Sequence, residues 1–207
     1  MNTFNLHLGD LHVGDLHVGD RSAAVSSHPE KFLLQVAHTS ELAPSVLAQA
    51  RELLDEVFAG EMTDHDWEHA LGGMHAIAWR STSVIGHASV IQRRLLHGSH
   101  ALRTGYVEGV GVHPDWQGQT IGAQMMVALE RIIETSYEIG ALGATGEAVS
   151  LYEHRGWIKW AGRTSALTPT GIVRTPEEDD CIYLLPLGHD LDISVDLTCD
   201  WRDGDAW

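Results

Sequence analysis

The chain has 207 residues, enough for one domain with a substantial core, and 43% of them are hydrophobic. Its 29 Asp and Glu outnumber 13 Lys and Arg, which gives a formal net charge of −16. Such a surface repels nucleic acid and anionic membranes, and no apolar run is long enough to predict a membrane span. Two cysteines make no disulfide framework and the N-terminus does not resemble a secretory signal, so we expect a cytoplasmic protein.

The first 30 residues differ from the rest of the chain. They contain a five-residue repeat, LHLGD, LHVGD and LHVGD, over residues 6–20, and end in a small, polar stretch. A repeat architecture needs more copies to bury a continuous core. We therefore expect residues 1–30 to form a mobile extension and residues 31–207 to form the domain.

The first half of the domain alternates between strand and helix patterns. Ser40 can cap a helix that runs to about residue 58, and Thr63 begins a capping-box sequence for a second, shorter helix that ends near Gly73. The strand from 101 to 112 contains three glycines, which predict a bulge or the close approach of a ligand. Strands are expected at residues 32–37, 74–79, 84–95 and 101–112.

The second half continues the alternation. Helices are expected at about residues 119–137 and 147–155, and strands at 141–144, 157–160 and 181–187. Residues 161–180, rich in Thr, Pro and acids, indicate a surface loop. The order of elements predicts an α/β (α+β) fold with a mixed, mostly antiparallel sheet and helices on both faces.

Residues 106–126 form the most specific local pattern. A strand leads into a Gln-Gly-Gln loop, and the loop leads into an apolar-periodic helix. Loop N–H groups and the positive end of a helix together bind anions. The segment therefore predicts a seat for the pyrophosphate of a phosphorylated cofactor.

Acidic residues are bunched at three places far apart in the sequence. The groups lie at residues 61–68, 177–180 and 200–205. A solvated surface would explain each group alone. Three such groups also suit a shared cationic substrate, whose ammonium groups carboxylates bind by charge-assisted hydrogen bonds.

Two motifs resemble those of the GCN5-related N-acetyltransferases (GNAT). Residues 117–122 read Gln-Gly-Gln-Thr-Ile-Gly, which fits the acetyl-CoA loop of that superfamily except that Thr120 stands where Gly is usual. Residues 151–157 fit its Tyr-x-x-x-Gly-aromatic helix end, from Tyr152 to Trp157. Segments at 66–75, 91–94, 105–110 and 199–207 resemble the aminoglycoside 2′-N-acetyltransferase family more closely, and this resemblance spans residues 32–207.

The resemblance implies the GNAT fold, acetyl-CoA as co-substrate, no metal, and a homodimer that acetylates the 2′-amine of aminoglycosides. It implies that Glu108 removes the amine proton through water, that the Val110 N–H polarises the thioester carbonyl, and that Tyr152 protonates the departing thiolate. The residues that it assigns to acetyl-CoA are Val110, Gly111, Val112, Gln117, Gly118, Gln119, Thr120, Ile121 and Gly122. Those that it assigns to the aminoglycoside are Glu61, Asp66, Glu108, Gly109, Gly143, Glu177, Glu178, Asp205 and Trp207, the last through its terminal carboxylate.

Three alternatives remain open from the sequence. The acceptor could be another amino sugar or polyamine, such as a cell-wall precursor. The same fold could serve as a non-catalytic CoA-binding module. Residues 65–69, His-Asp-Trp-Glu-His, also satisfy the H-x-x-E-H pattern of a zinc peptidase, although no third ligand is identifiable.

Overall fold

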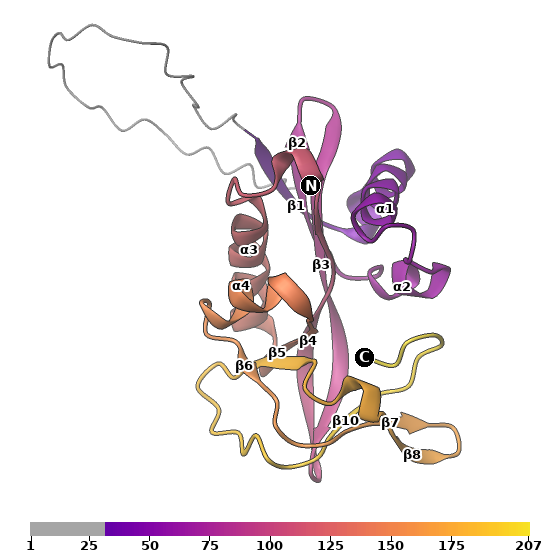
Figure 1. Cartoon of the computed structure of the whole chain (residues 1–207), viewed down its shortest axis with the longest axis vertical. Coiled ribbons are helices and arrows are strands. Elements are labelled where there is room, and N and C mark those ends of the chain that lie inside the picture. The colour runs from indigo at the N-terminus through magenta and orange to yellow at the C-terminus, as the bar shows by residue number, and fades with distance from the viewer. Residues whose placement is uncertain (1–31) are drawn as a thin grey trace, which may run out of the picture.

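A computed structural model describes residues 32–207 (Figure 1). The expected extension at residues 1–30, with its repeat, lies outside the described residues. Ten strands of the described part form one mixed sheet, in the order β6-β9-β5-β4-β3-β10-β7-β8, and β2 and then β1 extend it beside the first half of β3. The strands are β1 Leu33–His38, β2 Met74–Arg80, β3 Ser83–His97, β4 His100–Val112, β5 Ile139–Gly143, β6 Ile158–Lys159, β7 Thr164–Thr168, β8 Gly171–Arg174, β9 Ile182–Leu185 and β10 Leu197–Cys199.

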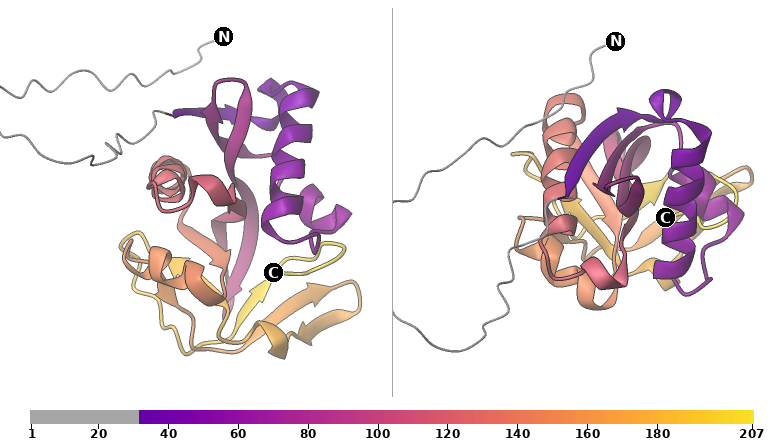
Figure 2. Two further views of the ribbon diagram at one scale, coloured as in Figure 1. Left: turned by 45° about the horizontal axis from the view of Figure 1, so that its top comes forward. Right: turned by 90° about the horizontal axis from the view of Figure 1, so that it is seen from above.

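Helices cover both faces of the sheet (Figures 1 and 2). Helices α1 (Pro44–Val57) and α2 (Asp64–His69) lie on one face, and α3 (Ile121–Ser136) and α4 (Val149–Glu153) lie on the other. Buried apolar residues of α3 pack on β2, β3, β4 and β5, because its apolar positions recur at helical spacing. The predicted α/β (α+β) class with a mixed, mostly antiparallel sheet is confirmed.

Helix α1 begins later than predicted. Ser40 lies in a separate 3-10 turn, Thr39–Glu41, which His38 and Glu41 cap. Pro44 occupies the first turn of α1, and Ala43 before it is extended at ψ 147°. A proline disfavours helical backbone at the preceding residue, so the helix cannot run through from Ser40. The shorter helix α2 has the predicted capping box, in which Thr63 and Asp66 accept each other's backbone N–H at 3.2 and 2.8 Å.

The prediction of a surface loop at residues 161–180 was wrong. The antiparallel hairpin β7–β8 and a 3-10 turn, Pro176–Glu178, occupy this segment, and β7 pairs in parallel with β10. Strand β10 was not predicted at all. Strands β7 and β10 pair with each other although they lie about thirty residues apart, and such pairing is not visible in the local sequence pattern. The expected helix at 147–155 is a 3-10 turn, Gly146–Ala148, followed by the shorter α4.

The sheet opens between β4 and β5. These parallel strands pair only from Thr104–Tyr106 to Ile139–Ala141, and β4 then continues to Val112 paired with β3 alone. The predicted bulge is present there, since the β3–β4 register shifts between His87 and Ser89, and Gly109 takes φ +55°, a conformation that glycine adopts without steric strain. The opening and the bulge together form the floor of the candidate site.

Candidate active site

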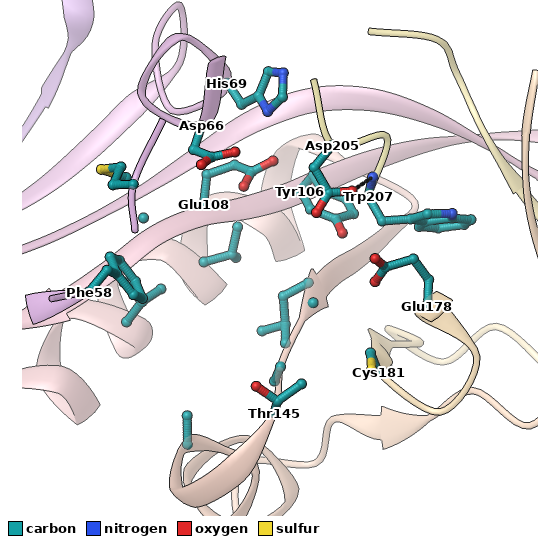
Figure 3. Close-up of a pocket in the computed structure, with 18 of the residues that line it drawn as sticks. Phe58, Asp66, His69, Tyr106, Glu108, Thr145, Glu178, Cys181, Asp205 and Trp207 are labelled. Atoms are coloured by element: carbon teal, nitrogen blue, oxygen red, sulfur yellow. Dashed lines mark hydrogen bonds between the residues drawn. The ribbon is translucent and has the colours of Figure 1, made fainter. Parts of the chain in front are cut away.

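A cavity of about 560 Å³ lies where β4 and β5 diverge (Figure 3). Its walls come from β4, β5, α2, α4, the α1–α2 connection, the 3-10 turn at Pro176–Glu178 and the C-terminal segment. The structure brings all nine residues predicted to contact the acceptor to this cavity, namely Glu61, Asp66, Glu108, Gly109, Gly143, Glu177, Glu178, Asp205 and Trp207. Tyr152 and Val110 also line it.

Glu108 lies on β4 at the bulge, and its carboxylate is paired with Arg202. The Arg202 Nη1 donates to Glu108 Oε1, and the two side chains are only 13% and 15% exposed. Burial raises the pKa of Glu108, and the Arg202 guanidinium opposes that rise. The carboxyl group is therefore partly desolvated and close to a cation, an environment suited to a base that must both hold and release a proton.

A chain of buried hydrogen bonds supports the bulge beside Glu108. His87 Nδ1 lies 2.7 Å from the carbonyl oxygen of Gly109, which can only accept, so this nitrogen carries the proton. His87 Nε2 must then accept from His75 Nδ1 at 2.9 Å, and His75 Nε2 accepts from the Thr39 hydroxyl at 2.8 Å. Burial lowers the pKa of His87 to about 4 and that of His75 to about 3, so both rings are neutral donors and acceptors.

The C-terminal segment closes one side of the cavity. The buried Arg93 donates from Nε to Asp200 Oδ1 at 2.8 Å and from Nη2 to the carbonyl oxygens of Asp200 and Ala206 at 2.9 and 2.7 Å. Arg202 donates to the Trp207 oxygen, and the Trp207 indole donates to Thr175 Oγ1 at 2.8 Å. These contacts bring the end of the chain beside Glu108 (Figure 3).

The carboxylates of the cavity come from three segments far apart in sequence. Asp66 lies on α2, Glu178 lies in the 3-10 turn before β9, and Asp205 lies near the C-terminus (Figure 3). Burial raises the pKa of Glu178, and the nearby Asp205 and Glu177 raise it further. Repulsion among these acids would be relieved by a cationic ligand.

A second cavity, of about 240 Å³, lies at the loop before α3. No side chain caps this helix, so its first N–H groups are left for an anion. Thr120 adopts the left-handed conformation at φ +65°, which the glycine usual in the motif would take without strain. The predicted acetyl-CoA residues that line this cavity are Val112, Gln117, Gly118, Thr120, Ile121 and Gly122.

The two cavities follow one another along the end of β4. Val110 lines the first and Val112 the second, and in α4 Tyr152 lines the first and Leu151 the second. Burial raises the pKa of Tyr152 to about 12, so its hydroxyl is protonated at neutral pH. A long ligand with an anionic group at the α3 N-terminus could therefore reach Glu108 with its other end.

The structure does not bring every predicted cofactor residue to a cavity. Gly111 and Gln119 line neither of the two. A Cβ at Gly111 would lie 2.7 Å from Leu54, so this glycine admits the close packing of α1 on β4. Gln117 Nε2 donates to the Val112 carbonyl at 3.1 Å, so a ligand would share this oxygen with the Gln117 side chain.

Sequence reasoning missed several residues of the cavity. Arg202 and Tyr106 stand inside segments that carry the family resemblance, but no role was assigned to either. The signal for Arg202 was an isolated cation in an otherwise acidic C-terminus. His69 also lines the cavity, and burial and Arg202 lower its pKa.

The H-x-x-E-H pattern does not gather into a metal site. His69 Nε2 lies 2.7 Å from the carbonyl oxygen of Asp203, and His65 Nδ1 lies 3.8 Å from Glu68. Within residues 32–207, no group of three or more His, Cys, Asp or Glu is arranged to hold a metal ion. No helix in that range is long and apolar enough to cross a membrane.

Comparisons with known proteins agree with this geometry. Residues 36–172 match a family described as an acetyltransferase (GNAT) domain. An aminoglycoside 2′-N-acetyltransferase of Mycolicibacterium fortuitum is 46% identical over 177 residues, which cover 84% of this chain and 91% of that protein. The fold is similar to a GNAT family N-acetyltransferase (YhbS) from Escherichia coli in complex with CoA, with a TM-score of 0.60, 16% identity, and 90% and 94% of the two chains covered. It is also similar to a GNAT family acetyltransferase from Brucella melitensis in complex with acetyl-CoA, with a TM-score of 0.54, 15% identity, and 82% and 96% covered.

Proposed function

The chain belongs to the GNAT acetyltransferases and, within them, to the aminoglycoside 2′-N-acetyltransferase family, and on this premise we propose that it acetylates the 2′-amine of aminoglycosides. Acetyl-CoA is the donor, and the product is an N-acetylated drug, which would give resistance. The observation that carries this proposal is the succession of the two cavities along the end of β4. This succession leads from the uncapped N-terminus of α3, past Tyr152 and Glu108, into a cavity lined by five further acidic residues.

Acetyl-CoA would enter along the end of β4. The pyrophosphate would bind the first N–H groups of α3 and the loop at Gln117 and Gly118, where the helix dipole favours an anion. The pantetheine arm would then follow β4 from Val112 to Val110. This path would bring the thioester to Val110 and Tyr152, which line the acceptor cavity.

The acceptor would bind in the acidic cavity. An aminoglycoside is a polycation, and its ammonium groups would pair with the acidic residues of the cavity, namely Glu61, Asp66, Glu177, Glu178 and Asp205. The repulsion that raises the pKa of Glu178 would fall when a cation binds. The cavity carboxylates repel one another in the free enzyme, and relief of this repulsion adds to the binding energy of the cationic acceptor.

Acetyl transfer proceeds in a ternary complex by direct attack. Glu108 accepts a proton from the 2′-ammonium, through water, and the free amine attacks the thioester carbonyl carbon. The C–N bond forms while the Val110 N–H stabilises the developing oxyanion. The C–S bond then breaks, and the Tyr152 hydroxyl donates its proton to the CoA thiolate. The nitrogen loses its second proton to water as it becomes an amide, and a proton from water restores the Tyr152 hydroxyl.

Two further statements concern where the enzyme acts and how it assembles. We place the enzyme in the cytoplasm, where acetyl-CoA is available, and we expect a homodimer. Analytical ultracentrifugation of the full chain would test the dimer, and a single species at the monomer mass would contradict it.

The decisive assay measures acetyl-CoA-dependent thiol release with aminoglycosides that carry either an amine or a hydroxyl at the 2′ position. We expect turnover only with the 2′-amines. No turnover with these drugs would refute the substrate, and turnover with the 2′-hydroxyl drugs would refute the position of transfer. Turnover confined to other amino sugars or polyamines would leave an acetyltransferase with a different acceptor.

Variants of the two proposed catalytic residues separate their roles. Glu108→Gln should lower kcat by about 10²–10⁴ and remove the acid limb of the pH–kcat profile. Tyr152→Phe should lower kcat because the departing CoA thiolate is no longer protonated by the enzyme. It should leave the acid limb of the pH–kcat profile in place. Glu177→Gln, at the exposed rim of the cavity, is the matched control and should raise the acceptor KM with little change in kcat.

A further inference from the structure

The hydroxyl of Tyr106 is a polar group of the acceptor cavity that the proposed mechanism does not use. The side chain is 1% exposed and lines the cavity. Among residues 32–207, only two buried side-chain polar atoms lack a hydrogen-bond partner, and they are this hydroxyl oxygen and Arg93 Nη1. Buried hydroxyls are nearly always hydrogen-bonded, so an unpaired one beside a binding cavity calls for a physical reason.

The position of Tyr106 relates it to the reacting centre. It precedes Glu108 by two residues on β4, so both side chains project from the same face of the strand, as Figure 3 shows. Tyr106 also makes the last β4–β5 pair, with Ala141, before the strands diverge. A Cβ on Gly143 would lie 3.8 Å from the Tyr106 hydroxyl oxygen, so the end of β5 lies beside that oxygen.

The surroundings of Tyr106 select a neutral ligand group. The guanidinium carbons of Arg93 and Arg202 lie 4.8 and 5.6 Å from the centre of its ring. Burial and the nearby Glu108 raise the pKa of Tyr106 well above its usual value, so the phenol stays neutral and can both donate and accept. The two guanidiniums repel an ammonium group, which the carboxylates elsewhere in the cavity attract.

We propose that Tyr106 determines acceptor specificity by hydrogen-bonding a neutral ring hydroxyl of the acceptor sugar, next to the amine that Glu108 serves. The inference rests on the proposed function and deepens it, since it divides the cavity into an acidic part for ammonium groups and a phenol for a hydroxyl. The hydroxyl of a bound sugar gives the Tyr106 oxygen the partner that it lacks in the free enzyme. A site built to pair with a hydroxyl discriminates against the deoxy analogue, because its own polar group is then left unpaired.

The test compares two 2′-amino aminoglycosides that differ only in the hydroxyl or hydrogen at the neighbouring 3′ carbon. Wild-type enzyme should use the hydroxylated acceptor with about tenfold higher kcat/KM than the deoxy one. Tyr106→Phe should abolish that preference by raising the KM of the hydroxylated acceptor and leaving the deoxy acceptor unchanged. Tyr137→Phe, at the end of α3 and outside both cavities, is the control and should keep the preference.

Thermal unfolding of Tyr106→Phe supplies a second readout. Because the hydroxyl has no partner in the free protein, its removal should leave Tm unchanged or raise it. A clear fall in Tm would show that the hydroxyl is paired within the fold and would overturn the proposal.

The kinetic outcomes distinguish this inference from the proposed function. Wild-type turnover with a preference that survives in Tyr106→Phe overturns the inference alone. Equal losses on both acceptors also overturn it, because they indicate a packing role. If wild-type enzyme acetylates neither 2′-amino acceptor, the proposed function fails and this inference fails with it.

Discussion

Acid should destabilise the protein through the buried pair His75 and His87. Both rings are neutral in the fold. The bonds from Thr39 to His75 and from His75 to His87 each end on an unprotonated ring nitrogen, whereas the bond from His87 to the Gly109 carbonyl needs only the Nδ1–H donor. Protonation of either ring would replace an acceptor by a second donor. The two rings therefore stay unprotonated in the folded protein at a pH where the same histidines of the unfolded chain bind a proton.

The size of the effect follows from the two pKa values. Burial lowers the pKa of His87 from 6.5 to about 4 and that of His75 from 6.5 to about 3. Folded-state pKa values below the unfolded value mean that this stability is fully present above 6.5 and is lost as the pH falls from there towards 4. At about pH 5 the unfolded histidines bind protons and the folded ones do not, which removes about 2 kcal/mol per ring, or about 4 kcal/mol for the pair.

A loss of about 4 kcal/mol is a large part of the 5–15 kcal/mol by which domains are usually stable, in order of magnitude. Urea unfolding at about pH 7.5 and about pH 5 would measure the loss in the wild type and in the double variant His75→Asn/His87→Asn. The change in the free energy of unfolding between the two pH values should be about 4 kcal/mol smaller in the variant. His100→Asn, on the exposed end of β4, should leave the change as in the wild type. An equal pH dependence in the wild type and the double variant would refute the reasoning.

Three further predictions concern the loop, the core and the acidic cavity. Gly118→Ala, at φ +74°, should destabilise the protein by about 1 kcal/mol in urea unfolding, whereas Thr120→Gly, at φ +65°, should be neutral or stabilising. A stabilising Gly118→Ala together with a destabilising Thr120→Gly would contradict the left-handed backbone of the loop. Glu130→Ala should lower the free energy of unfolding by about 3 kcal/mol in thermal unfolding, since Arg155 Nε and Trp157 Nε1 donate to this carboxylate at 2.7 and 2.9 Å. A loss below about 1 kcal/mol would show that these hydrogen bonds do not stabilise the fold. The acceptor KM should rise several-fold between about 0.05 and about 0.5 M NaCl because salt screens a polycation from the acidic cavity, and a KM independent of salt would contradict charge-driven binding.

Contiguous patterns were the most reliable guide to the fold. The capping box at Thr63 and Asp66 formed as predicted, because its hydrogen bonds join residues three apart. The three glycines of β4 likewise indicated a bulge, which the structure has at Gly109. Where the prediction failed at Ser40, the competing signal was also local, since Pro44 sets the start of α1.

Strand pairing between distant segments limited how much of the sheet could be predicted from the sequence. Strands β7 and β10 were missed because each is short and pairs with a strand elsewhere in the sheet, whereas β8 pairs only with β7 in the hairpin. A strand of three residues such as Leu197–Cys199 has no periodicity that a sequence pattern could show. These segments matter for the site, because they carry the 3-10 turn with Glu178 and the C-terminal residues to the cavity.

The sequence by itself determined the loop at Gln117, the Tyr152 motif and the family, because each is a run of neighbouring residues whose geometry is local. Only the tertiary structure decided what surrounds them. It pairs Glu108 with Arg202, 94 residues away, and leaves the Tyr106 hydroxyl without a partner beside them. Whether a polar group is satisfied depends on every chain segment that reaches it, and the sequence does not state which segments those are.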